Sequence, residues 1–250
     1  MPTRESTSRL AEQIFSDLRR RIILGELAPG KRLPAERQLA EAYGATRNTV
    51  REAIRKLEQG RLVTVRHGQG VTVSDFRRSA TLDILEPFLE SCPDPIERGL
   101  VLRELLQART EVLAWAVQLA AQRRTAENLA RVESAGAAIL SAACQGEAVE
   151  VARQTQRLID GLIDAAHSLP VRWLANAFLE LHDSIIERFP ALCVLEPGVE
   201  AYVPALQAAL RDGDADTARQ LTRDYFERVD RLLLSRAMEL AAPSHLPPRR

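Results

Sequence analysis

The feature that most constrains the fold is one change of hydrophobic period in the first third of the chain. Apolar residues recur at helical spacing along 7–24 and again over most of the later sequence. Between these parts, residues 62–66 and 71–73 form two short runs rich in valine, separated by His67-Gly68-Gln69-Gly70. Two glycines between such runs predict a tight β-hairpin. Because no later segment has this pattern, we expect a mainly α protein with one hairpin.

Three helices are expected before the hairpin. The first covers residues 7–24 and the second covers 34–43, and a glycine follows each of them. The third runs over 47–59, directly after Thr46, whose side chain can cap its N-terminus. Three helices followed by a two-stranded wing form a winged helix-turn-helix, in which a recognition helix enters the major groove of DNA.

The chain has a helical pattern from residue 77 onward, with breaks at prolines and glycines. Helices are expected at roughly 80–91, 95–122, 125–143, 146–167, 171–189, 198–212 and 214–240. We therefore expect a winged helix-turn-helix domain over residues 1–76 and an all-α bundle of six or seven helices over 77–242. The proline-rich end, residues 243–250, is expected to be a disordered tail.

Charge divides along the chain in a similar way. The whole sequence has 34 Lys and Arg against 34 Asp and Glu, a formal net charge of zero. Residues 1–78 carry 16 basic against 9 acidic side chains, a net charge of +7, whereas residues 79–250 carry 18 against 25, a net charge of −7. All but two of the basic residues are arginine, which suits bidentate hydrogen bonds to phosphate or guanine. This asymmetry indicates a basic binding module joined to an acidic domain.

The sequence predicts neither a membrane protein nor a secreted one. It has no apolar run of the about 18 residues that a membrane span needs, and its N-terminus, MPTRESTSRLAEQ, has no apolar signal core. The three cysteines, Cys92, Cys144 and Cys193, are far apart and form no C-x-x-C pair. We therefore expect a reduced cytoplasmic protein with no membrane partner.

The third helix opens with side chains that can read DNA. Arg47, Asn48 and Arg51 lie on its N-terminal turns, which a recognition helix presents to base edges. Arginine can bind guanine through two hydrogen bonds, and asparagine can bind adenine or a phosphate. The hydroxyls of Thr46 and Thr49 suit phosphate contacts or helix capping. The alternative for each of these residues is a solvated charge or a simple cap.

Three blocks of sequence carry a resemblance to a known family. They are LPAERQLA at 33–40, TRNTVREA at 46–53 and HGQG at 67–70. Their order and spacing resemble the winged helix-turn-helix domain of the GntR family of bacterial transcription regulators, over about residues 7–76. The resemblance implies double-stranded DNA as partner, contacted by Ala35, Arg37, Thr46, Arg47, Asn48, Thr49, Arg51, His67 and Gly68.

The helical remainder resembles the effector-binding domain of the FadR subfamily. The segment LDILE at 82–86 is similar to its linker helix, and RELLQARTEV at 103–112 to its first long helix, where Arg109 would point into the bundle. The resemblance implies a homodimer on a palindromic operator, whose affinity a small-molecule effector changes through linkage. A carboxylate or an acyl-CoA is the expected effector, although residues 225–233 lack the Gly/Ser/Trp signature of acyl-CoA-responsive members.

Most members of this subfamily bind a metal through one Asp and three His. An ungapped placement puts Gln156 and Asp160 where the Asp and the first His would lie. The second His falls near Tyr202 or Val203, and the third at Tyr225. Because a zinc-like site needs converging nitrogen, sulfur or oxygen ligands, we expect no metal and no cofactor.

The candidates for the effector pocket are polar residues on otherwise apolar faces: Arg109, His182 and Tyr225. A buried guanidinium needs a partner, which is either an anionic ligand or, for Arg109, an internal carboxylate from Asp160 or Asp164. For His182 and Tyr225 the alternative is ordinary packing. Trp115 and Trp173 are expected to pack in the core or at a dimer interface.

No catalytic motif is present, neither G-x-S-x-G nor a P-loop, H-E-x-x-H or G-x-G-x-x-G. We therefore expect no enzyme activity but a ligand-responsive transcription regulator, with repression and activation both open. The alternative is an architectural protein that binds DNA without sequence preference and uses its helical domain only to dimerise.

Overall fold

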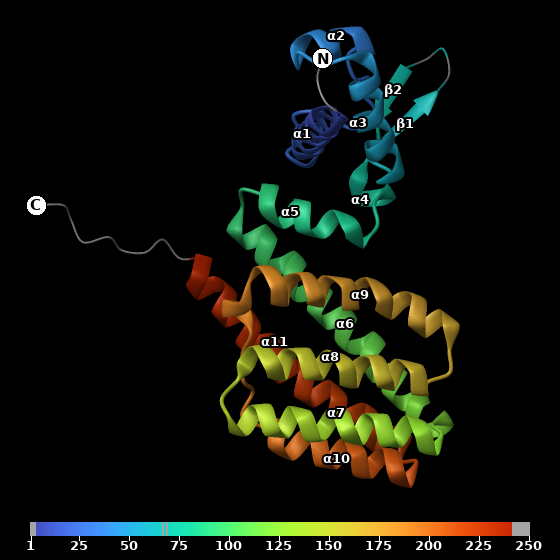
Figure 1. Ribbon diagram of the computed structural model, residues 1–250, viewed down its shortest axis with the longest axis vertical. Helices are drawn as coiled ribbons and strands as arrows, with labels where there is room; N and C mark the ends of the chain where they lie inside the picture. Colours follow the sequence, from blue (N-terminus) through green and yellow to red (C-terminus); the bar gives the residue numbers. More distant parts are fainter. Residues whose placement is uncertain (1–3, 67, 69, 242–250) are drawn as a thin grey trace, which may run out of the picture. The chain divides into compact units, whose positions relative to one another are not determined.

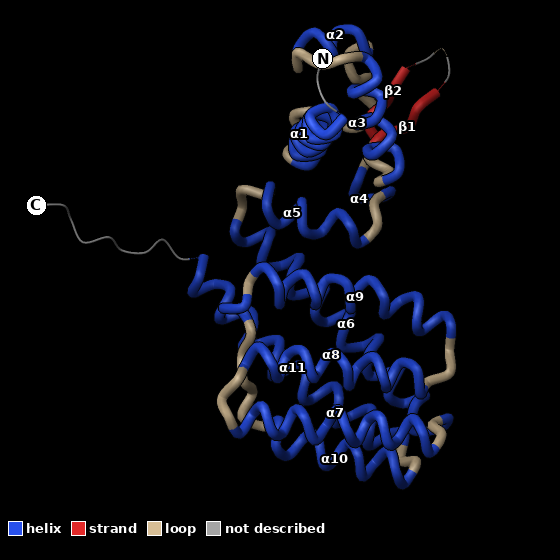
Figure 2. Tube along the Cα trace, viewed as in Figure 1, coloured by secondary structure: helices blue, strands red, loops and turns tan. Residues whose placement is uncertain are grey.

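The computed structural model describes residues 4–66, 68 and 70–241. They form two compact units, one up to Arg98 and one from Gly99 onward, and helices dominate both (Figure 1). The sheet of the described residues is the two-stranded wing (Figure 2). The expected fold, mainly α with a winged helix-turn-helix and a helical bundle, is confirmed. The predicted tail at 243–250 lies outside the described residues.

The first unit begins with three helices, α1 (Arg4–Ile23), α2 (Glu36–Ala42) and α3 (Arg47–Gln59). Helices α1 and α3 pack against each other, and Leu18 and Leu57 are fully enclosed. In α3 the apolar residues recur at helical spacing, so that one face is buried and the other stays free. Helix α3 is therefore packed on the core along one face and exposed along the other.

The wing consists of β1 (Val63–Arg66) and β2 (Gly70–Val73), which are antiparallel with Val63 opposite Val73. The loop before α2 continues this sheet, because the backbone N–H of Val73 donates to the carbonyl of Lys31 at 2.9 Å. The wing is thereby anchored next to the helix-turn-helix, a pairing that the sequence pattern did not predict.

Three short helices complete the first unit: α4 (Phe76–Ser79), the 3-10 helix η1 (Leu82–Ile84) and α5 (Leu85–Ser91). Helix α5 packs on α1, and the rings of Phe76 and Phe88 lie 6.4 Å apart. The sequence places the domain boundary after residue 76, whereas the compact unit extends to Arg98 because of this packing.

The second unit is a bundle of α6 (Pro95–Arg123), α7 (Ala126–Cys144), α8 (Ala148–Ala165), α9 (Leu169–Arg188), the 3-10 helix η2 (Pro190–Leu192), α10 (Val199–Asp212) and α11 (Ala215–Ala241). Helices α9, α8, α7 and α10 lie side by side in that order (Figure 1). The core between the helices is mostly aliphatic, with Val117, Leu162 and Leu206 almost fully buried. None of the described helices combines the length and apolar character that crossing a membrane requires.

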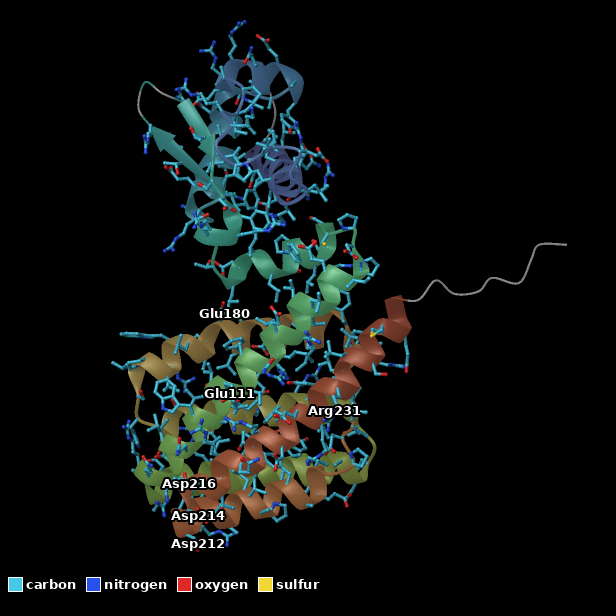
Figure 3. The ribbon with its side chains drawn as sticks, turned by 180° about the vertical axis from the view of Figure 1, so that it is seen from behind. Glu111, Glu180, Asp212, Asp214, Asp216 and Arg231 are labelled. Atoms are coloured by element: carbon cyan, nitrogen blue, oxygen red, sulfur yellow. The ribbon has the colours of Figure 1, made fainter. Side chains whose placement is uncertain are left out.

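Two glycines fix local geometry in the bundle. A methyl group on Gly136 of α7 would lie 2.8 Å from Cγ1 of Val203, so α7 and α10 approach closely at this point. Gly213 has a φ of +74°, which ends α10 in the left-handed region that glycine adopts without strain. Asp212, Asp214 and Asp216 gather at this turn (Figure 3), where the carboxylate of Asp214 accepts a hydrogen bond from the first turn of α11.

Candidate DNA-binding surface and effector pocket

Thr46 builds the N-terminus of the recognition helix α3. Its hydroxyl accepts a hydrogen bond from the backbone N–H of Thr49 at 3.2 Å and so caps the helix. The hydroxyl of Thr49 lies 2.8 Å from that of Thr46, and Thr49 is only 1% exposed. Thr46 is exposed at the start of the helix, whereas Thr49 stabilises the turn from inside.

Arg47 and Asn48 project from the first turn of α3 and are exposed. Within the described part of the chain neither side chain has a hydrogen bond or an ion pair, so both are available to a ligand. Arg51 is exposed as well, but its Nε donates to the Glu36 carboxylate of α2 at 2.7 Å. The sequence analysis did not predict Glu36 as the partner of Arg51. The available signal was the position of Glu36 in the first turn of α2, where an acidic side chain interacts favourably with the helix dipole.

The remaining predicted DNA contacts come from α2 and the wing. Ala35 directly precedes α2 and is exposed, and Arg37 is exposed with its guanidinium 3.0 Å from the Glu41 carboxylate. Gly68 is exposed and has a φ of +73°, and His67 lies outside the described residues. Contact of this set with DNA stays a prediction.

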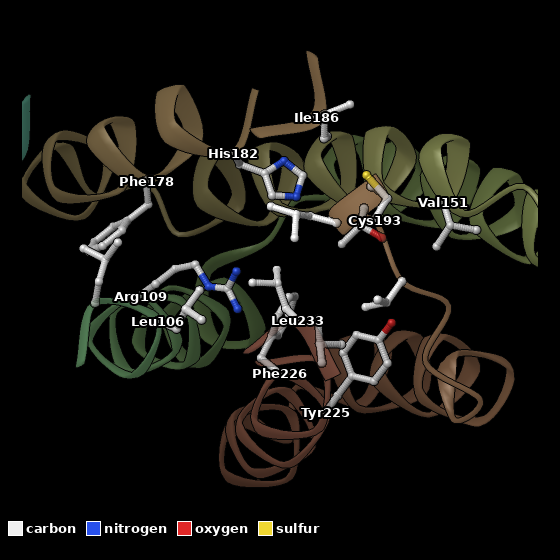
Figure 4. A pocket seen from close by; sticks show the side chains of 16 residues that line it. Leu106, Arg109, Val151, Phe178, His182, Ile186, Cys193, Tyr225, Phe226 and Leu233 are labelled. Atoms are coloured by element: carbon white, nitrogen blue, oxygen red, sulfur yellow. The ribbon is translucent and has the colours of Figure 1, made fainter. Parts of the chain in front are cut away.

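The second unit has a partly open cavity of about 80 Å³ among α6, α8, α9, the η2 loop and α11. Arg109, His182 and Tyr225 all line it, so the structure brings the three candidate effector residues together (Figure 4). The rest of the wall is mostly apolar, with Leu106 and Val229 as typical members. An apolar pocket with a few convergent polar groups is the usual form of a small-molecule site.

Arg109 is held by α11. Its Nη2 donates to Oδ1 of Asp230, and the hydroxyl of Thr110 donates to Oδ2 of Asp230 at 3.1 Å. The ring of Phe226 lies 5.2 Å from the guanidinium carbon, within cation–π distance. Burial raises the pKa of Asp230, and the adjacent Arg109 opposes that rise.

The alternative prediction, an ion pair of Arg109 with Asp160 or Asp164, is wrong. Both carboxylates bind Arg172 of α9 instead, Asp160 at 2.5 Å from Nη1 and Asp164 at Nη2. Asp230 was missed, although its spacing of four residues from Phe226 puts it on the same face of α11.

His182 is a neutral side chain beside this cation. Its Nδ1 lies 2.9 Å from the side-chain oxygen of Gln156, to which it can donate a hydrogen bond. Burial, together with the positive charge of Arg109, lowers the pKa of His182 to about 4. At neutral pH the ring therefore adds hydrogen bonding to the pocket but no charge.

Tyr225 combines packing with a place in the cavity wall. Its ring stacks on that of Tyr202 with centroids 4.0 Å apart, and Phe226 packs edge-on against both. Burial and the nearby carboxylate of Glu196 raise the pKa of Tyr225, so its hydroxyl stays protonated.

The positions that correspond to metal ligands hold other contacts. Asp160 is paired with Arg172, Gln156 meets His182, and Tyr202 stacks on Tyr225. Over residues 4–66, 68 and 70–241, no group of three or more His, Cys, Asp or Glu could hold a metal ion.

Comparisons with known proteins agree with both units. The profile of the bacterial regulatory proteins of the gntR family matches residues 10–73, and that of the FCD domain matches residues 104–228. The HTH-type transcriptional regulator Mce2R of Mycobacterium tuberculosis is 30% identical over 224 residues, which cover 90% of this chain and 91% of that protein. The fatty acid metabolism regulator protein of Shewanella pealeana is 40% identical over 86 residues, 34% of this chain and 35% of its own.

A solved structure supports the fold. It is described as Lar, which controls the expression of the Listeria monocytogenes agr system, and it superposes with a TM-score of 0.52 at 19% identity, over 90% of this chain and 96% of that one. The two profiles span the DNA-binding unit and most of the helical bundle, and the Mycobacterium relative spans both. The chain therefore belongs to the GntR family of bacterial transcription regulators and carries a FadR-like FCD domain behind its winged helix-turn-helix.

Proposed function

We propose that this regulator binds a palindromic operator as a homodimer, and that a small acid in the bundle cavity changes its operator affinity. The observation that supports DNA binding is that Arg47 and Asn48 are exposed and unpaired within the described structure. They lie on a helix whose opposite face is buried in the core. The net charge of +7 on residues 1–78 adds attraction to phosphate.

Exposed apolar side chains support the homodimer. On α9, Leu169, Trp173 and Leu174 are 66%, 67% and 51% exposed, and Trp115 of α6 is 40% exposed. Of the two expected places for these tryptophans, the core and a dimer interface, the core is therefore wrong. Large exposed apolar side chains mark interaction surfaces, and a second copy of the chain is the partner that a two-fold operator requires.

The size of the cavity favours a small acid over an acyl-CoA. The cavity is partly open and offers about 80 Å³ of space, room for a few water-sized groups. An acyl-CoA is far larger and would require the helices to separate. Arg109 supplies the cation for a carboxylate, and the aliphatic wall supplies contacts for a short apolar body.

The acid would act through linkage. A ligand changes operator affinity only as far as it binds the DNA-competent and DNA-incompetent states differently. Effector binding in the bundle would change the populations of these two states, and this change would alter how tightly the DNA-binding units bind the operator. A regulator of this kind would work in the cytoplasm, where the DNA lies.

Selection of bound duplexes from a random pool tests the proposal. The expected result is an enriched palindrome whose two halves each fit one recognition helix, together with a dimeric mass by sedimentation. Arg47→Ala should abolish the enrichment of at least one base pair in each half. Binding without any enriched sequence would instead favour an architectural protein that uses its bundle only to dimerise.

A further inference from the structure

The cation of the pocket is already occupied by a carboxylate of the protein itself. Arg109 and Asp230 join α6 to α11, and their side chains are only 15% and 11% exposed. Arg109 lines the cavity, whereas Asp230 holds the guanidinium from the side of α11. A ligand carboxylate that needs Arg109 must therefore compete with Asp230.

Asp230 uses only half of the available edge of Arg109. The Nε and Nη2 atoms lie on the same edge of a guanidinium, and a carboxylate can take both in a bidentate pair. Asp230 places one oxygen on Nη2 and the other on the hydroxyl of Thr110. The Nε of Arg109 is buried and has no hydrogen-bond partner among the described residues. A buried donor without a partner is unfavourable, so the internal pair is poorer than the one a free carboxylate can form.

The surroundings select the rest of the ligand. A second cavity of about 30 Å³ shares Arg109, Phe178, His182 and Phe226 with the first one and is otherwise lined by apolar side chains. Because His182 is neutral, Arg109 is the one cation among the residues that line the two cavities. The two cavities that share Arg109 therefore fit one carboxylate and a short hydrocarbon chain or ring.

We propose that Asp230 is a built-in competitor of the effector, and that the effector is a small apolar monocarboxylate that takes the Nε–Nη2 edge of Arg109 in its place. The proposal rests on the proposed function, because it takes this pocket to be the effector site. Asp230 keeps the hydroxyl of Thr110 as a partner once Arg109 has turned to the ligand.

Calorimetric titration with butyrate and hexanoate tests the competition, with the matching alcohols as controls for apolar binding. Asp230→Asn keeps the shape of the side chain and removes its charge. It should bind the acids about tenfold more tightly than the wild type, since measured coupling energies of close charge pairs begin at about 1.5 kcal/mol. Asp224→Asn, an exposed change of the same kind on the same helix, should leave acid binding unchanged.

Thr110→Val provides a second test if Asp230→Asn does not fold. It removes the one hydrogen bond that Asp230 keeps when Arg109 turns to the ligand. Asp230 then depends on Arg109 alone, so acid binding should weaken several-fold. Equal acid affinity in the wild type and the variants would overturn the competition while leaving the pocket as the effector site. Weaker binding by Asp230→Asn would also overturn it, because Asp230 would then position Arg109 for the ligand. If no variant binds either acid, the competition and the acid effector of the proposed function both fail, while operator selection still tests the DNA-binding part.

Discussion

Truncating Arg47 should separate sequence-specific from non-specific DNA binding. Arg47 is exposed on the first turn of α3 and has no partner in the described structure that it must give up on binding DNA. Arg55 lies about two turns further along the same helix and is also exposed. Arg47→Ala and Arg55→Ala therefore remove the same charge from one helix, but only the first removes a side chain from the end that we propose reads the bases.

The expected magnitude follows from this placement. A bidentate arginine–guanine pair contributes about 1–3 kcal/mol of discrimination. Arg47→Ala should thus lower the ratio of specific to non-specific affinity by about 5- to 150-fold. Arg55→Ala should lower both affinities together, since a lost phosphate contact acts on every sequence, and should reduce the salt slope by at most about 0.9.

Fluorescence anisotropy with a selected operator and a scrambled duplex, each at several salt concentrations, measures both ratios. If Arg47→Ala weakened binding to the two duplexes equally, Arg47 would be a phosphate contact and the assignment of base reading to it would be refuted. Unchanged binding to both would remove Arg47 from the interface altogether.

Two further predictions concern the bundle. Gly136→Ala should destabilise it by up to about 2 kcal/mol in urea unfolding. The new methyl would collide with the side-chain amide of Gln207 and crowd buried Val203, which costs about 1–3 kcal/mol, while helix propensity returns about 1 kcal/mol. Gly161→Ala, whose new methyl would lie 3.8 Å from Val132, should instead be neutral or stabilising, and equal effects would contradict the close approach. His182 stays neutral in the folded protein down to a pKa of about 4 but takes up a proton near pH 6.5 when unfolded. The wild type should therefore lose up to about 3 kcal/mol relative to His182→Gln as the pH falls from 7 to 4, and a difference that does not change with pH would contradict this burial.

Local signals explain why so much of the fold could be predicted. The recognition helix begins at Arg47 and ends at Gln59 as expected, because a threonine cap precedes it and a glycine follows it. The hairpin has the expected place because its two glycines sit between valine-rich runs. The pairing of Lys31 with the wing depends on where two distant segments meet, and no periodic pattern records that.

The partner of Arg109 shows where sequence reasoning ends at the candidate site. Burial of a guanidinium requires a counter-charge, so the existence of a partner could be predicted, but the sequence pointed to Asp160 and Asp164 and not to Asp230. Asp160 and Asp164 lie eight to twelve residues before Arg172, and the turn from α8 to α9 brings them to it. Arg109 pairs instead with Asp230, which lies 121 residues away in the sequence. Which carboxylate pairs with Arg109 depends on how the six helices of the bundle pack. This pairing decides whether an effector meets an unpaired guanidinium or must displace Asp230 from it.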